Sequence, residues 1–173
     1  MNELETLFSK ITTFVFDYDG VMTDGTVFSD PTGQPWRATN VKDGYALQLA
    51  SKLGYKVAVI SGAICPSMEV RMNSLGVTDA FTGVPNKVLK LKEYMKRKGI
   101  YAEEIIFMGD DIPDLNVMKE VGLPACPADA APEVKAISKF ISEKSGGKGA
   151  VRDLIEQTLK VHGKWMTAEA YSW

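Results

Sequence analysis

The amino-acid sequence predicts an α/β fold: a three-layer, Rossmann-like arrangement of a mostly parallel sheet with helices on both faces. Three short apolar runs, rich in β-branched and aromatic residues, have the profile of buried strands and lie at 11–16, 56–60 and 104–108. Segments with helical periodicity lie between them. Short strands that alternate with helices of about ten to twelve residues are typical of βαβ units, which build parallel sheets covered on both faces.

Each expected helix has a start or stop signal of its own, such as a capping side chain, an initial proline or a terminal glycine. In chain order the expected helices are an N-terminal one around Leu4, Leu7 and Phe8, 44–53 capped by Asp43 and ended by Gly54, Pro66 to the residue before Gly76, Lys87–Lys98 capped by Asn86 and ended by Gly99, 113–122, and Ala150–Val161. Weaker strand signals lie at 80–82, 123–126 and 139–142.

Composition excludes several classes of protein. With 173 residues, 45% of them hydrophobic, we expect one domain over residues 1–173. The 20 basic and 22 acidic residues give a net charge of −2, which argues against a nucleic-acid partner. No apolar run approaches the roughly 18 residues that a membrane span needs, and the N-terminus lacks the pattern of a signal peptide. We therefore expect a cytoplasmic protein.

Neither the cysteines nor the histidine point to a site. Cys65 and Cys126 have no metal-type spacing, and we expect both to be reduced and packed in or near the core. His162 is the single histidine, which argues against a His-rich zinc site and against a Ser-His-Asp triad. Carboxylates and backbone groups must carry most of the chemistry.

Polar side chains stand directly after the predicted strands, where ligands bind in open parallel sheets. They are Asp17 and Asp19, Ser61, then Asp110 and Asp111, with Lys87 at the start of a helix. Several carboxylates in one crevice repel each other unless a cation lies among them. Oxygen ligands without His or thiolate favour Mg²⁺, and a magnesium site beside a lysine and a serine is typical of phosphoryl chemistry.

Taken together, these motifs resemble those of the haloacid dehalogenase (HAD) superfamily of phosphohydrolases. The quoted stretches are DYDG from Asp17, Ser61-Gly62, Lys87, and GDDIPD from Gly109. Longer stretches resemble the 3-deoxy-D-manno-octulosonate 8-phosphate (KDO 8-phosphate) phosphatases: DYDGVMTDG, NVKDGY from Asn40, DDIPDL and GGKGAVR from Gly146. That family commonly has Ser/Thr-Gly-Arg after the second strand, whereas Ala63 takes the place of the arginine here.

The resemblance implies roles for these residues. Asp17 would be the nucleophile that forms an aspartyl-phosphate, and Asp19 the general acid and base. Mg²⁺ would be held by Asp17, by the backbone carbonyl of Asp19 and by Asp110. Asp111 or Asp114 would support the metal, and Ser61 and Lys87 would hold the phosphoryl oxygens. Because side chains two residues apart on an extended strand share one side, we expect Asp17 and Asp19 to address the same phosphorus.

A sugar acid phosphate also carries a carboxylate, so the substrate needs further cations. Gly62, Lys42, Lys148 and Arg152 are the candidates for substrate binding. The alternatives are that Lys42 is a solvated lysine at a helix start and that Arg152 caps or packs locally.

No cap domain fits between these motifs. We expect a protruding β-hairpin over about 23–39, carrying Phe28 and Trp36. Its aromatic side chains would be buried by pairing with other copies of the chain, and the resemblance favours a homotetramer; the alternative is that the hairpin folds back on its own domain. The tail, about 161–173, either packs on its own subunit or covers a neighbour's crevice.

The sequence thus predicts a Mg²⁺-dependent phosphatase that hydrolyses KDO 8-phosphate in lipopolysaccharide precursor synthesis. One alternative is a phosphatase for the 9-phosphate of a nine-carbon sugar acid, of the KDN or sialic acid type. A remote alternative is a phosphorelay receiver domain, which the order of the acidic motifs disfavours.

Overall fold

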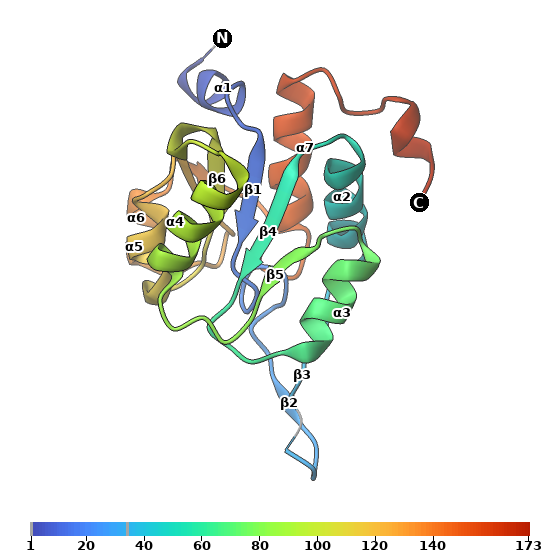
Figure 1. Cartoon of the computed structure of the whole chain (residues 1–173), viewed down its shortest axis with the longest axis vertical. Helices are drawn as coiled ribbons and strands as arrows, with labels where there is room; N and C mark the ends of the chain where they lie inside the picture. The colour runs from blue at the N-terminus through green and yellow to red at the C-terminus, as the bar shows by residue number, and fades with distance from the viewer. Residues whose placement is uncertain (1, 34) are drawn as a thin grey trace.

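The computed structural model describes residues 2–33 and 35–173 and contains a six-stranded sheet in which every pairing is parallel (Figure 1). The strands are β1 (Thr13–Phe16), β4 (Lys56–Ile60), β5 (Asp79–Phe81), β6 (Ile105–Met108), β7 (Leu123–Cys126) and β8 (Phe140–Ile141), in the spatial order β5-β4-β1-β6-β7-β8. The predicted α/β fold with a parallel sheet is confirmed, including the three weaker strands.

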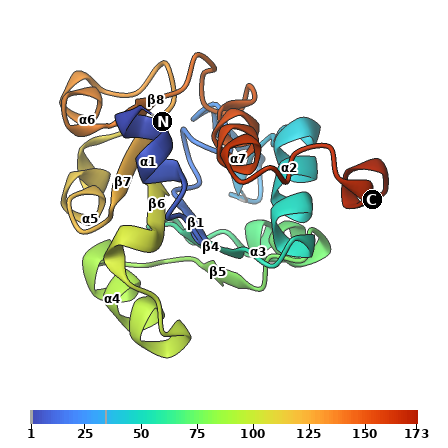
Figure 2. The same cartoon turned by 90° about the horizontal axis from the view of Figure 1, so that it is seen from above.

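Helices cover both faces of the sheet (Figure 2). The α-helices are α1 (Glu3–Phe8), α2 (Val41–Lys52), α3 (Pro66–Ser74), α4 (Lys87–Lys98), α5 (Leu115–Met118), α6 (Pro132–Ile137) and α7 (Ala150–Val161). Helices α2, α3 and α7 lie on one face, and α4, α5 and α6 lie on the other. The three layers are therefore those that the alternating pattern predicts.

Alternation along the strands builds two cores. In β1, Phe14 and Phe16 pack into the core under α2 and α7, whereas Val15 between them packs into the core under α4. All three side chains are fully buried. Burial of an aliphatic or aromatic side chain of this size contributes about 1.5–3 kcal/mol to stability, so the central strand anchors both layers.

The chain order places a crevice at one end of β1. From β1 the chain moves through α2 and α3 to β4 and β5, whereas from β6 it moves the other way through α5 and α6 to β7 and β8. Successive strands are therefore added in one direction from β1 and in the opposite direction from β6, and β1 and β6 are parallel neighbours. Ligands of doubly wound sheets bind outside the carboxyl ends of the strands at such a point.

The predicted hairpin is present and protrudes from the body (Figure 1). Its strands β2 (Phe28–Ser29) and β3 (Pro35–Trp36) pair antiparallel. Phe28 is 61% exposed and Trp36 is 64% exposed. The alternative in which the hairpin folds back on its own domain is therefore wrong for this structure.

The C-terminal tail packs against its own domain. The Tyr45 hydroxyl donates a hydrogen bond to the carbonyl of Ala170, and the Lys52 ammonium donates one to the carbonyl of Ser172. The ring of Trp173 meets the ring of Tyr45 edge-on, at 5.8 Å between centroids. Of the two sequence-based alternatives for the tail, the single chain adopts packing on the parent subunit.

Three expectations about helices were wrong in detail. Asn40, not Asp43, caps α2, because the Asn40 side chain accepts the backbone N–H groups of Lys42 and Asp43. The helix expected over 113–122 is short: a 3₁₀ turn (Ile112–Asp114) leads into α5, because the chain must turn at Gly122 to pass tightly beside the backbone of Glu103. Helix α6, which begins at Pro132, is not among the helices expected from the sequence.

None of the helices in the described ranges has both the length and the apolar character needed to cross a bilayer.

Asp43, which does not cap α2, connects α2 to α7. Its Oδ1 accepts the backbone N–H of Arg152 in the first turn of α7 at 2.7 Å, while its Oδ2 meets no donor among the described residues. Burial raises the pKa of Asp43 to about 6, against the effect of the N–H groups of Arg152 and Gly149. The residue predicted to start α2 thus fixes α7 onto α2.

We predict that Asp43→Asn removes part of the pH dependence of stability. The folded chain holds the Asp43 proton up to about pH 6, whereas the unfolded chain releases it near the ordinary value of 3.8, so stability falls as pH rises between these values. Relative to wild type, the asparagine variant should gain up to about 3 kcal/mol between pH 4 and pH 7. Urea unfolding at both pH values measures this, and a constant difference would contradict it.

Candidate active site

The loop after β1 is a compact turn braced from within. The buried hydroxyl oxygen of Thr23 accepts the backbone N–H groups of Gly20 and Gly25, each at 3.2 Å. Gly20 has a φ of +84°, and a Cβ there would lie 2.0 Å from Oδ2 of Asp110. The glycine therefore lets the first motif approach the carboxylate of the last one, which explains the Asp-x-Asp-Gly pattern physically.

The Gly146-Gly147 stretch supports this turn from outside. A Cβ on Gly146 would lie 1.8 Å from the carbonyl oxygen of Gly20. The backbone N–H of Gly147 donates to the carbonyl of Val21, and that of Gly146 donates to Asp129. These glycines allow backbone to pack directly on backbone, so this motif positions the loop that carries Asp17.

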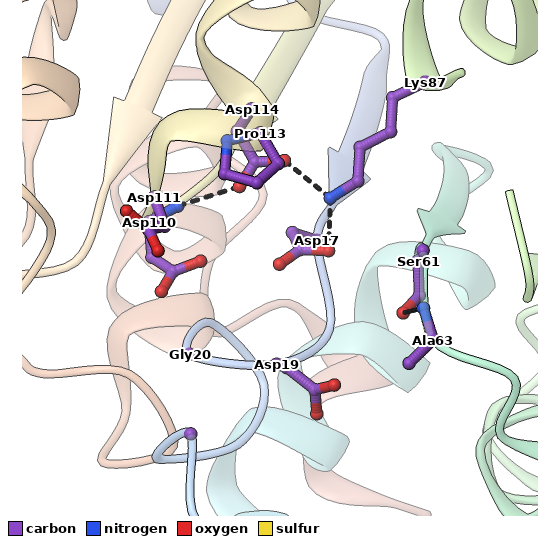
Figure 3. Close-up of a pocket in the computed structure, with 12 residues that line it drawn as sticks. Asp17, Asp19, Gly20, Ser61, Ala63, Lys87, Asp110, Asp111, Pro113 and Asp114 are labelled. Carbon is purple, nitrogen blue, oxygen red and sulfur yellow. Dashed lines mark hydrogen bonds and ion pairs between the residues drawn. The ribbon is translucent and has the colours of Figure 1, made fainter. Parts of the chain in front are cut away.

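Three carboxylates converge at the carboxyl ends of β1 and β6 (Figure 3). Asp17, Asp110 and Asp114 each offer an oxygen, and these oxygens lie within 4.8 Å of one another. Asp114 is buried and its Oδ2 accepts the backbone N–H of Asp110 at 3.1 Å. Asp111 is exposed and caps the following 3₁₀ turn through the N–H of Ile112. Of the two residues expected to support the metal, Asp114 belongs to this cluster.

Lys87 reaches the cluster from the first residue of α4. Its ammonium lies 2.6 Å from Oδ1 of Asp17 and 2.6 Å from Oδ1 of Asp114. Burial disfavours its charge, but the two carboxylates outweigh burial and raise the pKa of Lys87. One ammonium is thus shared by two carboxylates, and Lys87 lies beside Asp17 in this structure.

One lysine does not balance the cluster. Burial and then the charge of Asp114 raise the pKa of Asp17 to about 6. Burial and then the charges of Asp17 and Asp114 raise the pKa of Asp110 to about 8. These carboxylates therefore resist ionisation together in the metal-free chain. A divalent cation among them would relieve the repulsion, and oxygen donors alone suit Mg²⁺.

The cluster opens into a cavity of about 360 Å³. Ser61 and Ala63, which follow β4, lie on the opposite wall (Figure 3), and Gly62 between them also lines the cavity. The buried Ser61 hydroxyl oxygen accepts the backbone N–H of Ala63 at 3.2 Å. A phosphoryl group in this cavity would meet Asp17 on one side and Ser61 and Lys87 on the others.

Asp19 does not join the cluster. Its carboxylate points away from Asp17 (Figure 3) and lies against Arg37 instead. The expectation that Asp17 and Asp19 point to the same side fails in this structure, because the extended strand ends at Phe16 and the chain turns after Asp17. Sequence reasoning missed Arg37, although a basic residue at the base of a hairpin that overhangs acidic side chains was an available signal.

The remaining substrate-binding candidates lie outside the cavity wall. Lys42 is exposed at the start of α2. The Lys148 ammonium lies 3.3 Å from Oδ2 of Asp24. Arg152 stacks between the rings of Tyr45 and Trp165, at 5.5 and 5.2 Å from their centroids. In this structure Arg152 packs locally, as one alternative had it, and Gly62 alone of these candidates lines the cavity.

We predict that Mg²⁺ binding strengthens as pH rises from about 5 to about 8, because Asp17 and Asp110 must release protons to ligate a cation. Isothermal titration calorimetry measures the affinity. Asp110→Asn should weaken binding at least about tenfold, since it removes a carboxylate from the cluster. Glu93→Gln, at an exposed carboxyl on α4 that does not line the cavity, is the control and should change binding little. Equal losses in both variants would contradict the assignment of the cluster.

Comparison with known proteins agrees with this geometry. Residues 60–155 match the family of haloacid dehalogenase-like hydrolases. The chain is 33% identical over 163 residues to the 3-deoxy-D-manno-octulosonate 8-phosphate phosphatase KdsC of Escherichia coli K12, covering 94% of this chain and 87% of that one.

Solved structures of similar proteins share the whole fold. The KDO 8-phosphate phosphatase of Yersinia pestis superposes with a TM-score of 0.92 at 31% identity, over 94% of this chain and 88% of that one. The corresponding phosphatase of Moraxella catarrhalis, solved with a magnesium ion, a phosphate ion and KDO, has a TM-score of 0.90 at 32% identity, over 93% and 92%. The chain therefore belongs to the haloacid dehalogenase-like hydrolases, and its sequence and fold group it with the KDO 8-phosphate phosphatases.

Proposed function

We propose that this protein is a Mg²⁺-dependent phosphatase that hydrolyses KDO 8-phosphate to the free sugar acid and inorganic phosphate, in lipopolysaccharide precursor synthesis. The observation that carries the proposal is the cluster of Asp17, Asp110 and Asp114, two of which pair with Lys87, in a chain similar to KDO 8-phosphate phosphatases over nearly its whole length. The Moraxella relative with magnesium, phosphate and KDO supports both the metal and the substrate.

The metal fits the residues present. Asp17, Asp110 and the backbone carbonyl of Asp19 would hold Mg²⁺, and Asp114 would support Asp110 through its backbone N–H. When bound, Mg²⁺ supplies positive charge that neutralises the phosphoryl oxygens and keeps Asp17 ionised. Lys87 and the Ser61 hydroxyl would hold the remaining phosphoryl oxygens.

The reaction then proceeds in two displacements. A carboxylate oxygen of Asp17 forms a bond to phosphorus while the bond to the sugar oxygen breaks. The electron pair stays on the sugar oxygen, which takes a proton from Asp19. Water next attacks phosphorus and passes its proton to Asp19. The bond between phosphorus and Asp17 breaks, which frees inorganic phosphate and restores both carboxyl groups.

Two alternatives stand differently after the comparisons. The 9-phosphate of a nine-carbon sugar acid stays a candidate substrate on the ground of Ala63 alone, whereas the relatives described above are named for KDO 8-phosphate. The phosphorelay receiver domain is excluded, since the chain belongs to the HAD-like hydrolases.

We further propose that the enzyme works in the cytoplasm as a homo-oligomer, with a tetramer favoured by the family resemblance. Buried, unpaired Cys65 and Cys126 support a reducing compartment. Exposed Phe28 and Trp36 on the projecting hairpin support association, because two bare strands are marginal alone and a neighbouring copy would bury these rings.

A panel of phosphorylated sugar acids tests the function. We expect KDO 8-phosphate to be hydrolysed with the highest kcat/KM in Mg²⁺, and the nine-carbon 9-phosphate and simple hexose phosphates to be hydrolysed more slowly. EDTA should abolish turnover, and Mg²⁺ should restore it. Ca²⁺ should support turnover poorly, because its looser coordination misplaces the phosphoryl group. Full activity in the chelator, or preference for the nine-carbon substrate, would contradict this proposal.

Substitution of the two aspartates tests the mechanism. Asp17→Asn should abolish turnover because the nucleophile is lost, and Asp19→Asn should lower kcat by about 10²–10⁴-fold because the acid and base are lost. Thermal unfolding of each variant is the control for folding. Trapping of a phosphorylated chain from wild type, and its absence in Asp17→Asn, would identify the intermediate, whereas substantial turnover by Asp17→Asn would rule out the covalent route.

A further inference from the structure

Arg37 holds Asp19 by both carboxylate oxygens. Its Nε lies 2.5 Å from Oδ1 and its Nη2 lies 3.0 Å from Oδ2, which is a bidentate ion pair between residues 18 positions apart. The Arg37 side chain is only 8% exposed. Its third nitrogen, Nη1, lies 3.8 Å from the Sγ of Cys65, beside the start of α3. The guanidinium is thus buried between the first motif and the segment that follows Ala63.

This ion pair is incompatible with the proposed role of Asp19. A carboxylate whose two oxygens both accept N–H groups from one guanidinium is fixed in direction, so Asp19 cannot turn toward a leaving group while this pair is intact. The carboxylate also points away from Asp17, where phosphorus must lie (Figure 3). Asp19 must therefore leave Arg37 before it can protonate the sugar oxygen.

Release of Asp19 would leave Arg37 buried without an anion. A buried unpaired guanidinium is costly, and an anion that takes the place of the carboxylate offsets this cost better than water does. Asp19 lines the cavity, and Arg37, which does not line it, holds the Asp19 carboxylate by both oxygens. If Asp19 turns away from Arg37 toward Asp17, the guanidinium is left facing the space that the carboxylate occupied, at the wall of the cavity. The partner must match a planar fork of N–H donors, which a carboxylate does.

We propose that Arg37 exchanges Asp19 for the carboxylate of the substrate, so that binding of a sugar acid releases the general acid into the active site. This inference rests on the proposed function. In it, Arg37 contacts the substrate, determines specificity for an acidic sugar, and supplies from the hairpin the cation that Ala63 lacks after β4. Phosphorylated sugars without a carboxylate leave Asp19 paired with Arg37 and are therefore poor substrates.

Lys87, Lys148 and Arg152 each already have partners of their own. Lys87 is shared by Asp17 and Asp114, and Lys148 pairs with Asp24. Arg152 stacks on Tyr45 and Trp165 and pairs with Glu156. Arg37 is distinct because its partner is a residue that catalysis itself must move. When substrate breaks the ion pair between Arg37 and Asp19, it frees the general acid, so turnover increases.

Binding of the free sugar acid, without phosphate, is the first test. Calorimetry with the Mg²⁺-loaded protein compares KDO with inorganic phosphate as ligands. Arg37→Gln should weaken KDO binding about 10- to 100-fold and leave phosphate binding unchanged, as expected for loss of a charged hydrogen-bond pair. Arg37→Lys should restore part of the affinity. Arg97→Gln on α4, which breaks the ion pair of Arg97 with Asp79 of β5, is the matched control and should change neither.

Removal of Asp19, the other partner of the ion pair, distinguishes a substrate-binding role of Arg37 from a structural one. Asp19→Ala removes the competing carboxylate, so it should bind free KDO several-fold more tightly than wild type. A purely structural Arg37 predicts no gain, or a loss, in that variant. This measurement also remains informative if Arg37→Gln unfolds.

Kinetics on two substrates completes the test. Against KDO 8-phosphate, Arg37→Gln should raise KM and lower kcat/KM about 10- to 100-fold. Against glucose 6-phosphate, which has no carboxylate, kcat/KM should stay constant or rise. Equal losses on both substrates, unchanged kinetics on both, or no tightening of KDO in Asp19→Ala overturns the exchange alone. Failure of wild type to hydrolyse KDO 8-phosphate overturns the proposed function and the exchange together.

Discussion

Repulsion among buried carboxylates is the constraint on which this structure depends. Asp17, Asp110 and Asp114 meet within 4.8 Å at the switch point between β1 and β6, where burial and mutual charge raise the pKa values of the first two. Lys87 offsets the charge of two of them. The remaining charge makes the site a receptor for a hard cation and, through it, for a phosphoryl group. The stored repulsion is thus the source of metal affinity.

Glycines at close backbone contacts let the loops of the site pack tightly enough to hold these charges together. Gly20 lets the first loop touch Asp110, and Gly146 lets a distant loop pack on the carbonyl of Gly20. Thr23 supplies hydrogen bonds inside the turn. Between β1 and α2 the described residues form a thin hairpin rather than a domain, so the cavity is covered by few groups of its own chain. Specificity must then come from single residues at the rim.

Arg37 is the residue at the rim to which we assign substrate specificity. It belongs to the hairpin by sequence and to the active site by contact, and it holds the carboxylate of the proposed general acid pointing away from Asp17. A hairpin that both associates with other copies and carries this arginine would couple assembly to catalysis. The same two strands then serve for the surface that a cap domain provides elsewhere in the superfamily.

The sequence alone determined the sheet, the ordered motifs and the family, because strand periodicity, capping residues and glycine positions are local signals. It placed Asp17, Ser61, Lys87 and Asp110 at one rim through the rule that parallel strands end at one edge. Only the tertiary structure decided what depends on contacts between distant residues. Asp43 caps α7 instead of α2, Arg152 stacks on Tyr45 and Trp165, and Asp19 turns to Arg37. Each of these contacts joins residues that the fold brings together from separate elements, and a charged side chain selects the partner that best offsets its burial, which no local pattern encodes.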